Sequence, residues 1–239
     1  MALWHASVVT LFPDMFPGPL AHSLAGKGLQ KEIWKINTVH IRDFAPDKHR
    51  TVDDTSYGHN AGMILKPDVV HSALCHAVEH FPGTPQLLFM TPRGEPFKQP
   101  LARQLSQSDG VIILCGHYEG VDERVINHWT RTHGLKEVSV GDYILSGGEV
   151  AAITLLDACV RLLPKIVHNE DSLSRESFDL DLLEFPQYTK PCIWQDEVVP
   201  EVLLSGDHKK IAAWQKHKAE KITRERRPDL WKLYLQTNG

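Results

Sequence analysis

Residues 139–149, Ser-Val-Gly-Asp-Tyr-Ile-Leu-Ser-Gly-Gly-Glu, have the composition of a loop that holds a flat polar ligand. The adjacent glycines Gly147 and Gly148 let the backbone turn sharply and approach a ligand closely. Ser146 is placed to cap the helix that follows, and Glu149 to support its positive end. A site for a bare phosphate usually includes a lysine, and residues 139–149 contain none. An adenine-containing cofactor therefore suits this loop better. The alternative is an ordinary strand–turn–helix junction.

Other glycine-bearing segments follow apolar runs, at 57–63, 91–94, 115–124 and 203–208. In an open α/β sheet, ligands bind in the crevice beyond the carboxyl ends of the strands. We therefore expect the loops 91–94, 116–120 and 141–148 to line one crevice. The chain has no GxGxxG or P-loop, which argues against a classical dinucleotide or nucleoside-triphosphate site. It has no GxSxG or HExxH either, which weakens serine-hydrolase and zincin interpretations.

The elements that must position these loops follow from hydrophobic periodicity. Short apolar or alternating runs predict strands at 6–12, 33–41, 87–90 and 111–115. Helical spacing predicts helices at 68–80, 100–106, 121–133 and 15–29, the last starting late because of Pro17 and Pro19. Strands that alternate with helices predict an α/β fold with a mainly parallel sheet.

Residues 150–163 form a predicted helix that is apolar nearly all round. Such a helix is buried on more than one side, and one side is a candidate subunit interface. Arg161 is conspicuous inside it, because a buried arginine needs a partner or a ligand.

The charge distribution divides the chain into a predicted domain at 1–164, an acidic, aperiodic interdomain loop at 165–191 and a helical basic domain at 192–239. Residues 207–227 carry eight basic against three acidic side chains, although the net charge of the whole chain is −4. This asymmetry predicts contact with nucleic-acid phosphates, for which the candidates are Lys209, Lys210, Arg226 and Arg227. A solvated helix with i,i+4 ion pairs is the alternative.

Global composition indicates an ordinary globular protein, with 42% hydrophobic and 23% charged residues among 239. Four scattered cysteines without a CxxC, and no signal-like or membrane-length apolar run, predict a cytoplasmic protein with reduced thiols and no membrane partner.

The pairs His71/Cys75 and His76/His80 have helical spacing but lie on different faces. No metal site is therefore expected, and a zinc-dependent enzyme is a weak alternative.

An ordered set of motifs closely resembles the bacterial tRNA (guanine-N1)-methyltransferases of the SPOUT superfamily. The set covers nearly the whole chain and comprises 42–44 (Arg-Asp-Phe), 47–49 (Asp-Lys-His), 52–54 (Val-Asp-Asp), 61–63 (Ala-Gly-Met), 91–94 (Thr-Pro-Arg-Gly), 115–124 (Cys-Gly-His-Tyr-Glu-Gly-Val-Asp-Glu-Arg), 141–149 (Gly-Asp-Tyr-Ile-Leu-Ser-Gly-Gly-Glu), 181–191 (Asp-Leu-Leu-Glu-Phe-Pro-Gln-Tyr-Thr-Lys-Pro), 199–206 (Val-Pro-Glu-Val-Leu-Leu-Ser-Gly) and 226–231 (Arg-Arg-Pro-Asp-Leu-Trp).

The resemblance implies a parallel-sheet N-terminal domain with a deep trefoil knot, plus a small helical C-terminal domain. The knotted loops would hold S-adenosylmethionine in a bent conformation and release S-adenosylhomocysteine, with Mg²⁺ as an open addition. The implied cofactor residues are Phe89, Met90, Thr91, Pro92, Gly116, Glu119, Val140, Gly141, Asp142, Tyr143, Ile144, Leu145, Gly147 and Gly148. The resemblance also implies a homodimer with active sites shared between subunits. The implied substrate is the tRNA guanosine 3′-adjacent to the anticodon, recognised with a preceding guanosine.

The chemistry implied by the resemblance needs a base, because guanine N1 carries a proton. The family places an aspartate just before Ser-Phe, where this chain has Glu176 before Ser177. Glu176 is therefore the expected general base, with Asp171 and Asp179 as competitors. Arg161 is expected to stabilise the negative charge that develops on guanine O6.

The chain also departs from the family pattern at two other places. His117 stands where an arginine often precedes Tyr-Glu-Gly, and His59 and Asn60 stand where glycines are usual. Two alternative functions remain open beside the tRNA enzyme. One is a non-catalytic RNA-binding protein with the same fold, and the other is a SPOUT enzyme acting on ribosomal RNA or on a ribose hydroxyl.

Overall fold

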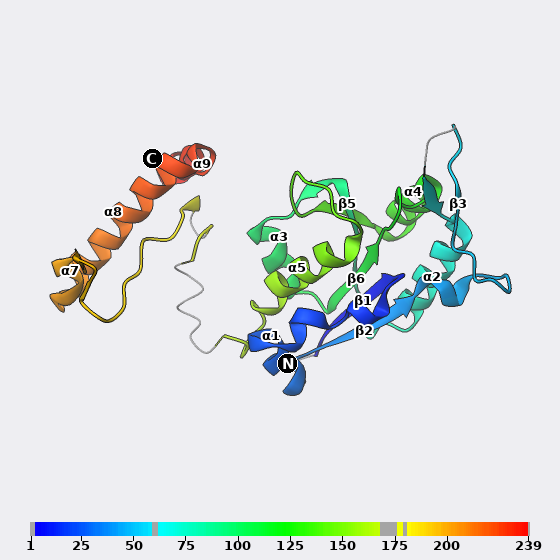
Figure 1. Ribbon diagram of the computed structural model, residues 1–239, viewed down its shortest axis with the longest axis horizontal. Coiled ribbons are helices and arrows are strands. Elements are labelled where there is room, and N and C mark those ends of the chain that lie inside the picture. The colour runs from blue at the N-terminus through cyan, green and yellow to red at the C-terminus, as the bar shows by residue number, and fades with distance from the viewer. Residues whose placement is uncertain (1–2, 59–61, 168–175, 179–180, 239) are drawn as a thin grey trace. The chain divides into compact units, whose positions relative to one another are not determined.

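The computed structural model describes residues 3–58, 62–167, 176–178 and 181–238 (Figure 1). The chain divides into two compact units, Met1–His168 and Asn169–Gly239, each of which is described by itself. Among the described residues, no helix is both long enough and apolar enough to cross a membrane.

A five-stranded parallel sheet forms the centre of the first unit. Its order is β2-β1-β6-β5-β7, and the strands are β1 (Trp4–Thr10), β2 (Trp34–His40), β5 (Gln86–Pro96), β6 (Gly110–Cys115) and β7 (Lys136–Ser139). All residues of β6 are buried, as a central strand covered on both faces requires. The prediction of an α/β fold with a mainly parallel sheet is therefore confirmed.

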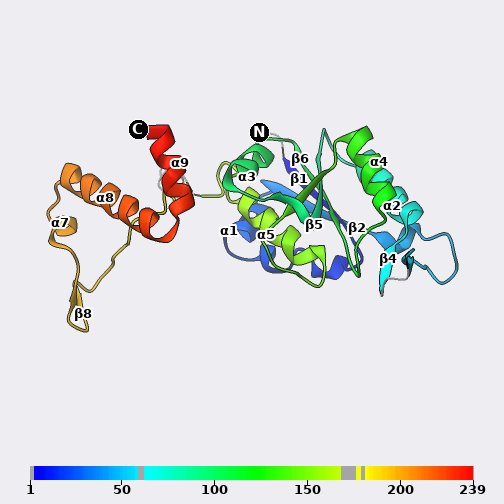
Figure 2. The same ribbon diagram turned by 90° about the horizontal axis from the view of Figure 1, so that it is seen from above.

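Helices cover both faces of this sheet (Figure 2). The helices α2 (Pro67–Glu79) and α4 (Glu123–His133) lie on one face, and α1 (Ser23–Gln30), α3 (Gln99–Ser106) and α5 (Gly148–Val160) lie on the other. Side chains alternate across a strand, so neighbours in β1 enter different cores. Val9 packs in the core with Trp129 of α4, and Val8 packs in the core with Leu155 of α5.

The predicted strands and helices of this unit are found, but with different bounds. The strand predicted at 6–12 is Trp4–Thr10, and the helix predicted at 150–163 is Gly148–Val160, so Arg161 is its C-cap and does not lie inside it. Strand β5 runs on to Pro96 instead of ending at 90, because a register shift between Met90 and Glu95 lets it pair with β7 on both sides of the irregularity. The helix predicted at 15–29 begins only at Ser23, since the prolines before it lie in short 3₁₀ turns. The antiparallel hairpin β3 (Asp53–Thr55) and β4 (Met63–Leu65) was not predicted, because aspartates disfavour strands.

The second unit contains a short hairpin, β8 (Ile193–Trp194) with β9 (Glu197–Val198), and the helices α7 (Glu201–Leu204), α8 (His208–Arg226) and α9 (Pro228–Asn238). Asp207 caps α8 by accepting hydrogen bonds from the main-chain nitrogens of Lys209 at 3.1 Å and Lys210 at 3.2 Å. Helices α8 and α9 are joined by the Tyr234 hydroxyl, which donates to Glu220 at 2.8 Å.

Thr223 ties an extended segment of the second unit to α8. Its buried hydroxyl donates to the Ala219 carbonyl at 2.7 Å and accepts from the Leu183 main-chain nitrogen at 2.8 Å. Upstream of Leu183, the Ser177 hydroxyl accepts from the Glu184 nitrogen at 3.1 Å, and Phe178 N donates to Leu182 O at 2.7 Å. The described residues around Glu176 are therefore part of a turn that is anchored on α8.

Candidate functional site

A cavity of about 270 Å³ lies at the carboxyl ends of β5, β6 and β7. Its walls come from the segments 89–92, 116–120 and 138–148, so the three loops expected to share a crevice do meet. The predicted cofactor residues that line it are Phe89, Met90, Thr91, Pro92, Gly116, Glu119, Val140, Gly141, Tyr143, Ile144, Leu145, Gly147 and Gly148. Asp142 is the exception: it is exposed and is not among the residues that line the cavity.

Glycines allow the 116–120 loop and the start of α5 to pass very close to each other. Gly148 N donates to Gly116 O at 2.9 Å. A Cβ on Gly148 would lie 2.8 Å from Cys115 Cα, and one on Gly116 would lie 3.1 Å from Phe89 Cε2. The cavity therefore presents bare backbone where side chains would fill it.

We expect Gly148→Ala to destabilise the first unit by about 1–3 kcal/mol, because the added methyl meets main-chain atoms that cannot rotate away. The same displacement would spread the loops and weaken ligand binding in the cavity. Thermal unfolding and calorimetry with S-adenosylmethionine measure the two effects. Gln104→Ala, an exposed change on α3 that does not line the cavity, is the control. An unfolding temperature equal to that of the unchanged protein would contradict the close approach.

The start of α5 differs from the sequence-based prediction. The N-cap is Gly147 and no side chain caps the helix, so the assignment of Ser146 as the cap is wrong. Extended backbone at Gly147 carries the chain one residue further before the helix begins. Glu149 does lie in the first turn, where its buried carboxylate accepts from the Thr10 hydroxyl at 2.7 Å. Burial and the adjacent Glu149 raise the pKa of Cys115.

The cavity also includes residues outside the predicted cofactor set. His117, Tyr118, Gly120 and Ser146 belong to the loops that were expected to line the crevice, whereas Val138, Ser139 and Ala151 were not expected there. The His117 ring lies 4.8 Å from the ring of Phe12, and its buried Nδ1 has no hydrogen-bond partner among the described residues. Tyr118 has a left-handed backbone conformation with φ +57°. His117 and Tyr118 lie directly after β6, in the loop 116–120 that the sequence predicted to line the crevice, so their position in the sequence was a signal for this site.

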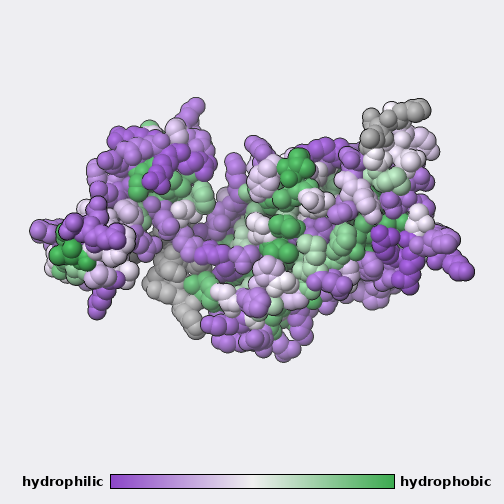
Figure 3. Space-filling view, viewed as in Figure 1, coloured by the Kyte–Doolittle hydropathy of each residue, from purple (hydrophilic) through white to green (hydrophobic). Residues whose placement is uncertain are grey.

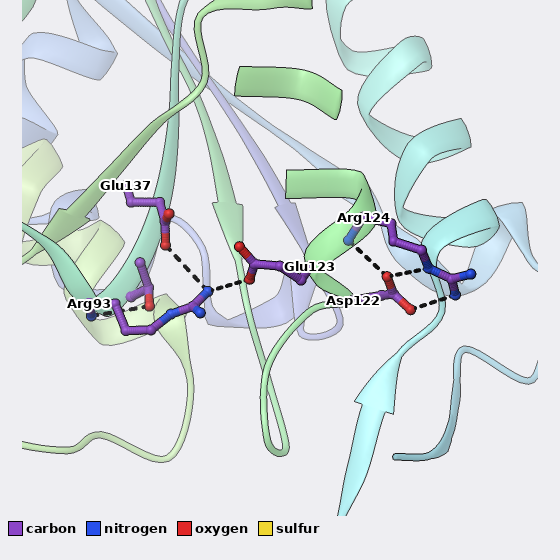
Figure 4. Close-up of polar contacts among 6 residues, drawn as sticks. Arg93, Asp122, Glu123, Arg124 and Glu137 are labelled. Atoms are coloured by element: carbon purple, nitrogen blue, oxygen red, sulfur yellow. Dashed lines mark hydrogen bonds and ion pairs between the residues drawn. The ribbon is translucent and has the colours of Figure 1, made fainter. Parts of the chain in front are cut away.

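Ion pairs brace the elements that carry the cavity loops (Figure 4). Arg93 of β5 donates to Glu123 of α4 at 2.8 Å and to Glu137 of β7 at 3.5 Å. The hydrogen bond with Glu123 is the main cause that raises the pKa of Arg93. Asp122 caps α4 through Arg124 N at 2.9 Å and also pairs with the Arg124 guanidinium. Because these side chains are largely exposed, their contribution is orientation more than stability.

The two expected catalytic residues lie in different units. Arg161 is the half-buried C-cap of α5 in the first unit, and Glu176 is half-buried in the second unit. Each takes part in an interaction within the structure. Their joint role stays a prediction. The competing carboxylates Asp171 and Asp179, and the departures His59 and Asn60, lie outside the described residues.

The basic side chains of residues 207–227 follow α8 and its C-terminus. Four of them form ion pairs: Lys210 with Asp207 at 3.3 Å, Lys216 with Glu220 at 3.8 Å, Lys221 with Glu225 at 3.9 Å and Arg227 with Asp229 at 2.6 Å. Lys209 and Arg226 are exposed. Helix α8 therefore carries both ion pairs between neighbouring side chains and exposed basic side chains, so both interpretations of its charge stay open.

The histidines of α2 belong to ring contacts and hydrogen bonds. His71 Nδ1 accepts from Trp129 Nε1 at 3.1 Å, and its Nε2 lies 3.5 Å from Cys75 Sγ. Across the described ranges, no group of three or more His, Cys, Asp and Glu residues is placed to hold a metal ion. All four cysteines are free thiols, and burial raises the pKa of Cys159 to about 12.

Comparison with known proteins gives the family. The model of the tRNA (Guanine-1)-methyltransferase TrmD family matches residues 4–233. A tRNA (guanine-N(1)-)-methyltransferase from Sphingopyxis alaskensis is 54% identical over 231 residues, covering 97% of this chain and 92% of that protein. Proteins of the same name from Brucella canis (55% over 233 residues; 98% and 92%) and Chelativorans sp. (53% over 236 residues; 99% and 98%) are similarly close. The chain therefore belongs to the tRNA (guanine-N1)-methyltransferase family.

Proposed function

We propose that this protein transfers a methyl group from S-adenosylmethionine to N1 of the tRNA guanosine that lies 3′-adjacent to the anticodon. Family membership supports methylation of a tRNA guanine. The observation that carries the proposal is the cavity at the carboxyl ends of β5, β6 and β7, which gathers the residues that the sequence assigned to a cofactor.

The cavity fits the cofactor by its shape and by its chemistry. Gly116, Gly147 and Gly148 leave a backbone cradle that side chains would close. Tyr143, Ile144 and Leu145 add apolar side chains to the lining. Main-chain N–H and C=O groups in such a cradle match the edge of adenine, and the apolar side chains match its faces. When bound, the cofactor supplies a methyl group on a sulfonium, which is electrophilic.

The remaining chemistry is assigned to Glu176 and Arg161. The carboxylate of Glu176 accepts the proton from guanine N1, which leaves that nitrogen nucleophilic. The guanidinium of Arg161 stabilises the negative charge that this creates on O6. With N1 made nucleophilic and O6 stabilised in this way, the bound cofactor would supply the methyl group that N1 accepts, and S-adenosylhomocysteine would be the product. Glu176 belongs to the second unit and Arg161 to the first.

An apolar surface beside the cavity supports a homodimer with shared active sites. Tyr143 is 55% exposed, Ile144 81% and Val150 50%, and hydrophobic surface extends over the region of α5 in Figure 3. Exposed apolar side chains that adjoin one another are typical of protein interfaces. In the dimer they would close the mouth of the cavity and exclude water.

The proposal includes the trefoil knot of the family in the 89–148 region and a cytoplasmic location, where the free thiols stay reduced.

We also propose that the second unit binds tRNA through Lys209, Lys210, Arg226 and Arg227. Affinity should then fall steeply as salt rises, because phosphate contacts release counterions. Replacing Lys209 or Arg226 with glutamine is expected to reduce the slope of log affinity against log salt by about one for each charge removed. Filter binding across a salt series measures this, with Lys31→Gln in the first unit as the control. Unchanged slopes in both α8 variants would remove this helix from the tRNA site.

Thr223 is expected to position Glu176, because its hydroxyl anchors the segment that follows Glu176. In Thr223→Val the Leu183 nitrogen loses its hydrogen-bond acceptor. This should destabilise the anchored turn by about 1–3 kcal/mol, and a poorly positioned Glu176 should then reduce turnover roughly tenfold. Thr223→Ser keeps the hydroxyl and should restore turnover. Single-turnover kinetics with saturating tRNA and cofactor separate this effect from affinity. Equal turnover of the valine and serine variants would contradict the role.

The test of the proposed function is transfer of labelled methyl from S-adenosylmethionine to a tRNA transcript. A matched transcript has the guanosine 3′ of the anticodon changed to adenosine. Label on the first transcript only is the expected result. Label on both would keep the methyltransferase and discard the position. Label on neither, with tRNA still bound, would favour a non-catalytic RNA-binding protein.

A further inference from the structure

A second cavity of about 320 Å³ lies between the β2 edge of the sheet and the end of α2. This β2–α2 groove shares no residue with the first cavity among the described residues that line the two. His5 and Ser7 face α2, because they lie on the same face of β1 as Val9, which packs in the core with the residues of α2. Asn37 pairs with Ser7 across the parallel ladder and therefore lies on the same face.

The groove is lined by polar groups that can donate hydrogen bonds, namely His5, Ser7, Asn37, His76 and His80. Ser7 is buried at its base, whereas Asn37, His76 and His80 are exposed at its sides. Among the described residues that line this groove there is no Asp or Glu. Hydroxyl, amide and imidazole donors around one space suit an acceptor-rich ligand.

His5 lines the groove and has one buried ring nitrogen. Its Nδ1 atom is buried and has no hydrogen-bond partner among the described residues. Leaving a buried polar atom unpaired costs about 1–3 kcal/mol, which a change of ring orientation that pairs it with a ligand would recover. Burial, and then the positive charge of Lys35 on β2, lower the pKa of His5. A negative ligand would offset both effects, although Lys35 also pairs with Glu32 at 3.3 Å.

His80 presents one ring nitrogen to a ligand. Its Nδ1 donates to the His76 carbonyl at 2.9 Å, so Nε2 is the atom left for another partner. The rings of His76 and His80 stack with centroids 4.1 Å apart, and Phe44 lies against His76 at 5.2 Å. Protonated Nε2 is a donor, and an anion near it selects that form. Asp109, whose main-chain oxygen accepts from His5 N at 3.1 Å, has its carboxylate engaged by Thr84 N at 2.9 Å.

We propose that the β2–α2 groove binds a small oxyanion, a phosphate or carboxylate group, through the rings of His5 and His80 together with the Ser7 hydroxyl and the Asn37 amide. The site is separate from the methyl-transfer cavity and does not depend on the proposed function. Its occupant is a free anion or the anionic group of a small molecule, which the volume of the groove accommodates.

The test follows the histidine ring Cε1–H signals of the full chain by NMR, near the ordinary histidine pKa of about 6.5. Inorganic phosphate and acetate are added in separate arms, against sodium chloride at equal ionic strength. Phosphate is expected to move the His5 and His80 signals saturably, whereas chloride is not. A response to phosphate alone would define a phosphate site, and a response to both anions a general oxyanion site.

Variants decide whether the groove itself is responsible. His5→Gln and His80→Gln are each expected to weaken phosphate binding about tenfold, since each removes a hydrogen bond to a charged group. His133→Gln, an exposed change at the end of α4, is the matched control and should bind as before. The thermal unfolding temperature should stay unchanged, which reports that each variant is folded. Phosphate shifts that match those from chloride, or that survive in both groove variants, would overturn the proposal.

Discussion

Replacing Glu176 with glutamine is expected to lower the rate of methyl transfer about a thousandfold, within the range of general base catalysis. The change keeps the size and the hydrogen-bonding capacity of the side chain but removes the basic oxygen. Guanine N1 would then keep its proton and remain a poor nucleophile. Binding of tRNA and of S-adenosylmethionine should change little. Single-turnover transfer of labelled methyl, with separate binding measurements, separates the two effects.

The matched control for this prediction is Glu184→Gln. Glu184 lies in the same anchored turn, and its side chain is exposed. The Glu184→Gln variant should therefore retain normal turnover, although it changes the net charge by the same amount as Glu176→Gln. Glu176→Asp, which restores the carboxylate that is usual in the family, should be far more active than the glutamine variant. Full activity of Glu176→Gln would assign the base elsewhere, to Asp171 or Asp179, and would leave the enzyme interpretation intact.

Arg161→Ala is expected to reduce turnover about a hundredfold to a thousandfold, the usual loss when one donor to a developing negative charge is removed. Arg161 ends α5 and is half-buried. Its proposed contact is with guanine O6, and it does not line the first cavity among the residues described there. Affinity for S-adenosylmethionine should therefore stay close to normal. Calorimetry for the cofactor and rapid-quench kinetics for transfer are the two measurements.

Two further variants separate charge from packing at this helix end. Arg161→Lys keeps the positive charge but loses the planar fork, so an intermediate rate is expected. Arg131→Ala, an exposed arginine in the last turn of α4, controls for the loss of a surface charge. A parallel loss of cofactor affinity in Arg161→Ala would show that the residue supports the cavity and not the guanine.

Local patterns in the sequence identified most of the secondary structure correctly. The runs at 111–115 and 33–41 form β6 and β2 because a strand needs only a short apolar or alternating segment between turn residues. The errors fall where distant segments decide the outcome. The sequence placed the cap of α5 at Ser146, whereas the pairing of His117 with Gly147 in an isolated bridge sets the backbone there. Likewise, β5 continues past Pro92 because β7 is available to pair with it.

The sequence by itself determined the family and the α/β class of this protein, since ordered motifs and hydrophobic periodicity are properties of the chain alone. It also determined which loops follow strands, and therefore which residues are candidates for a crevice. Only the tertiary structure decided that the loops after β6 and β7 come into main-chain contact at Gly116 and Gly148, and that Asp142 is exposed and does not line the shared cavity. The β2–α2 groove likewise joins His5 to His80, which lie far apart in the chain. The physical reason is that pairing order and packing between layers depend on which surfaces bury each other, and no local pattern records that choice.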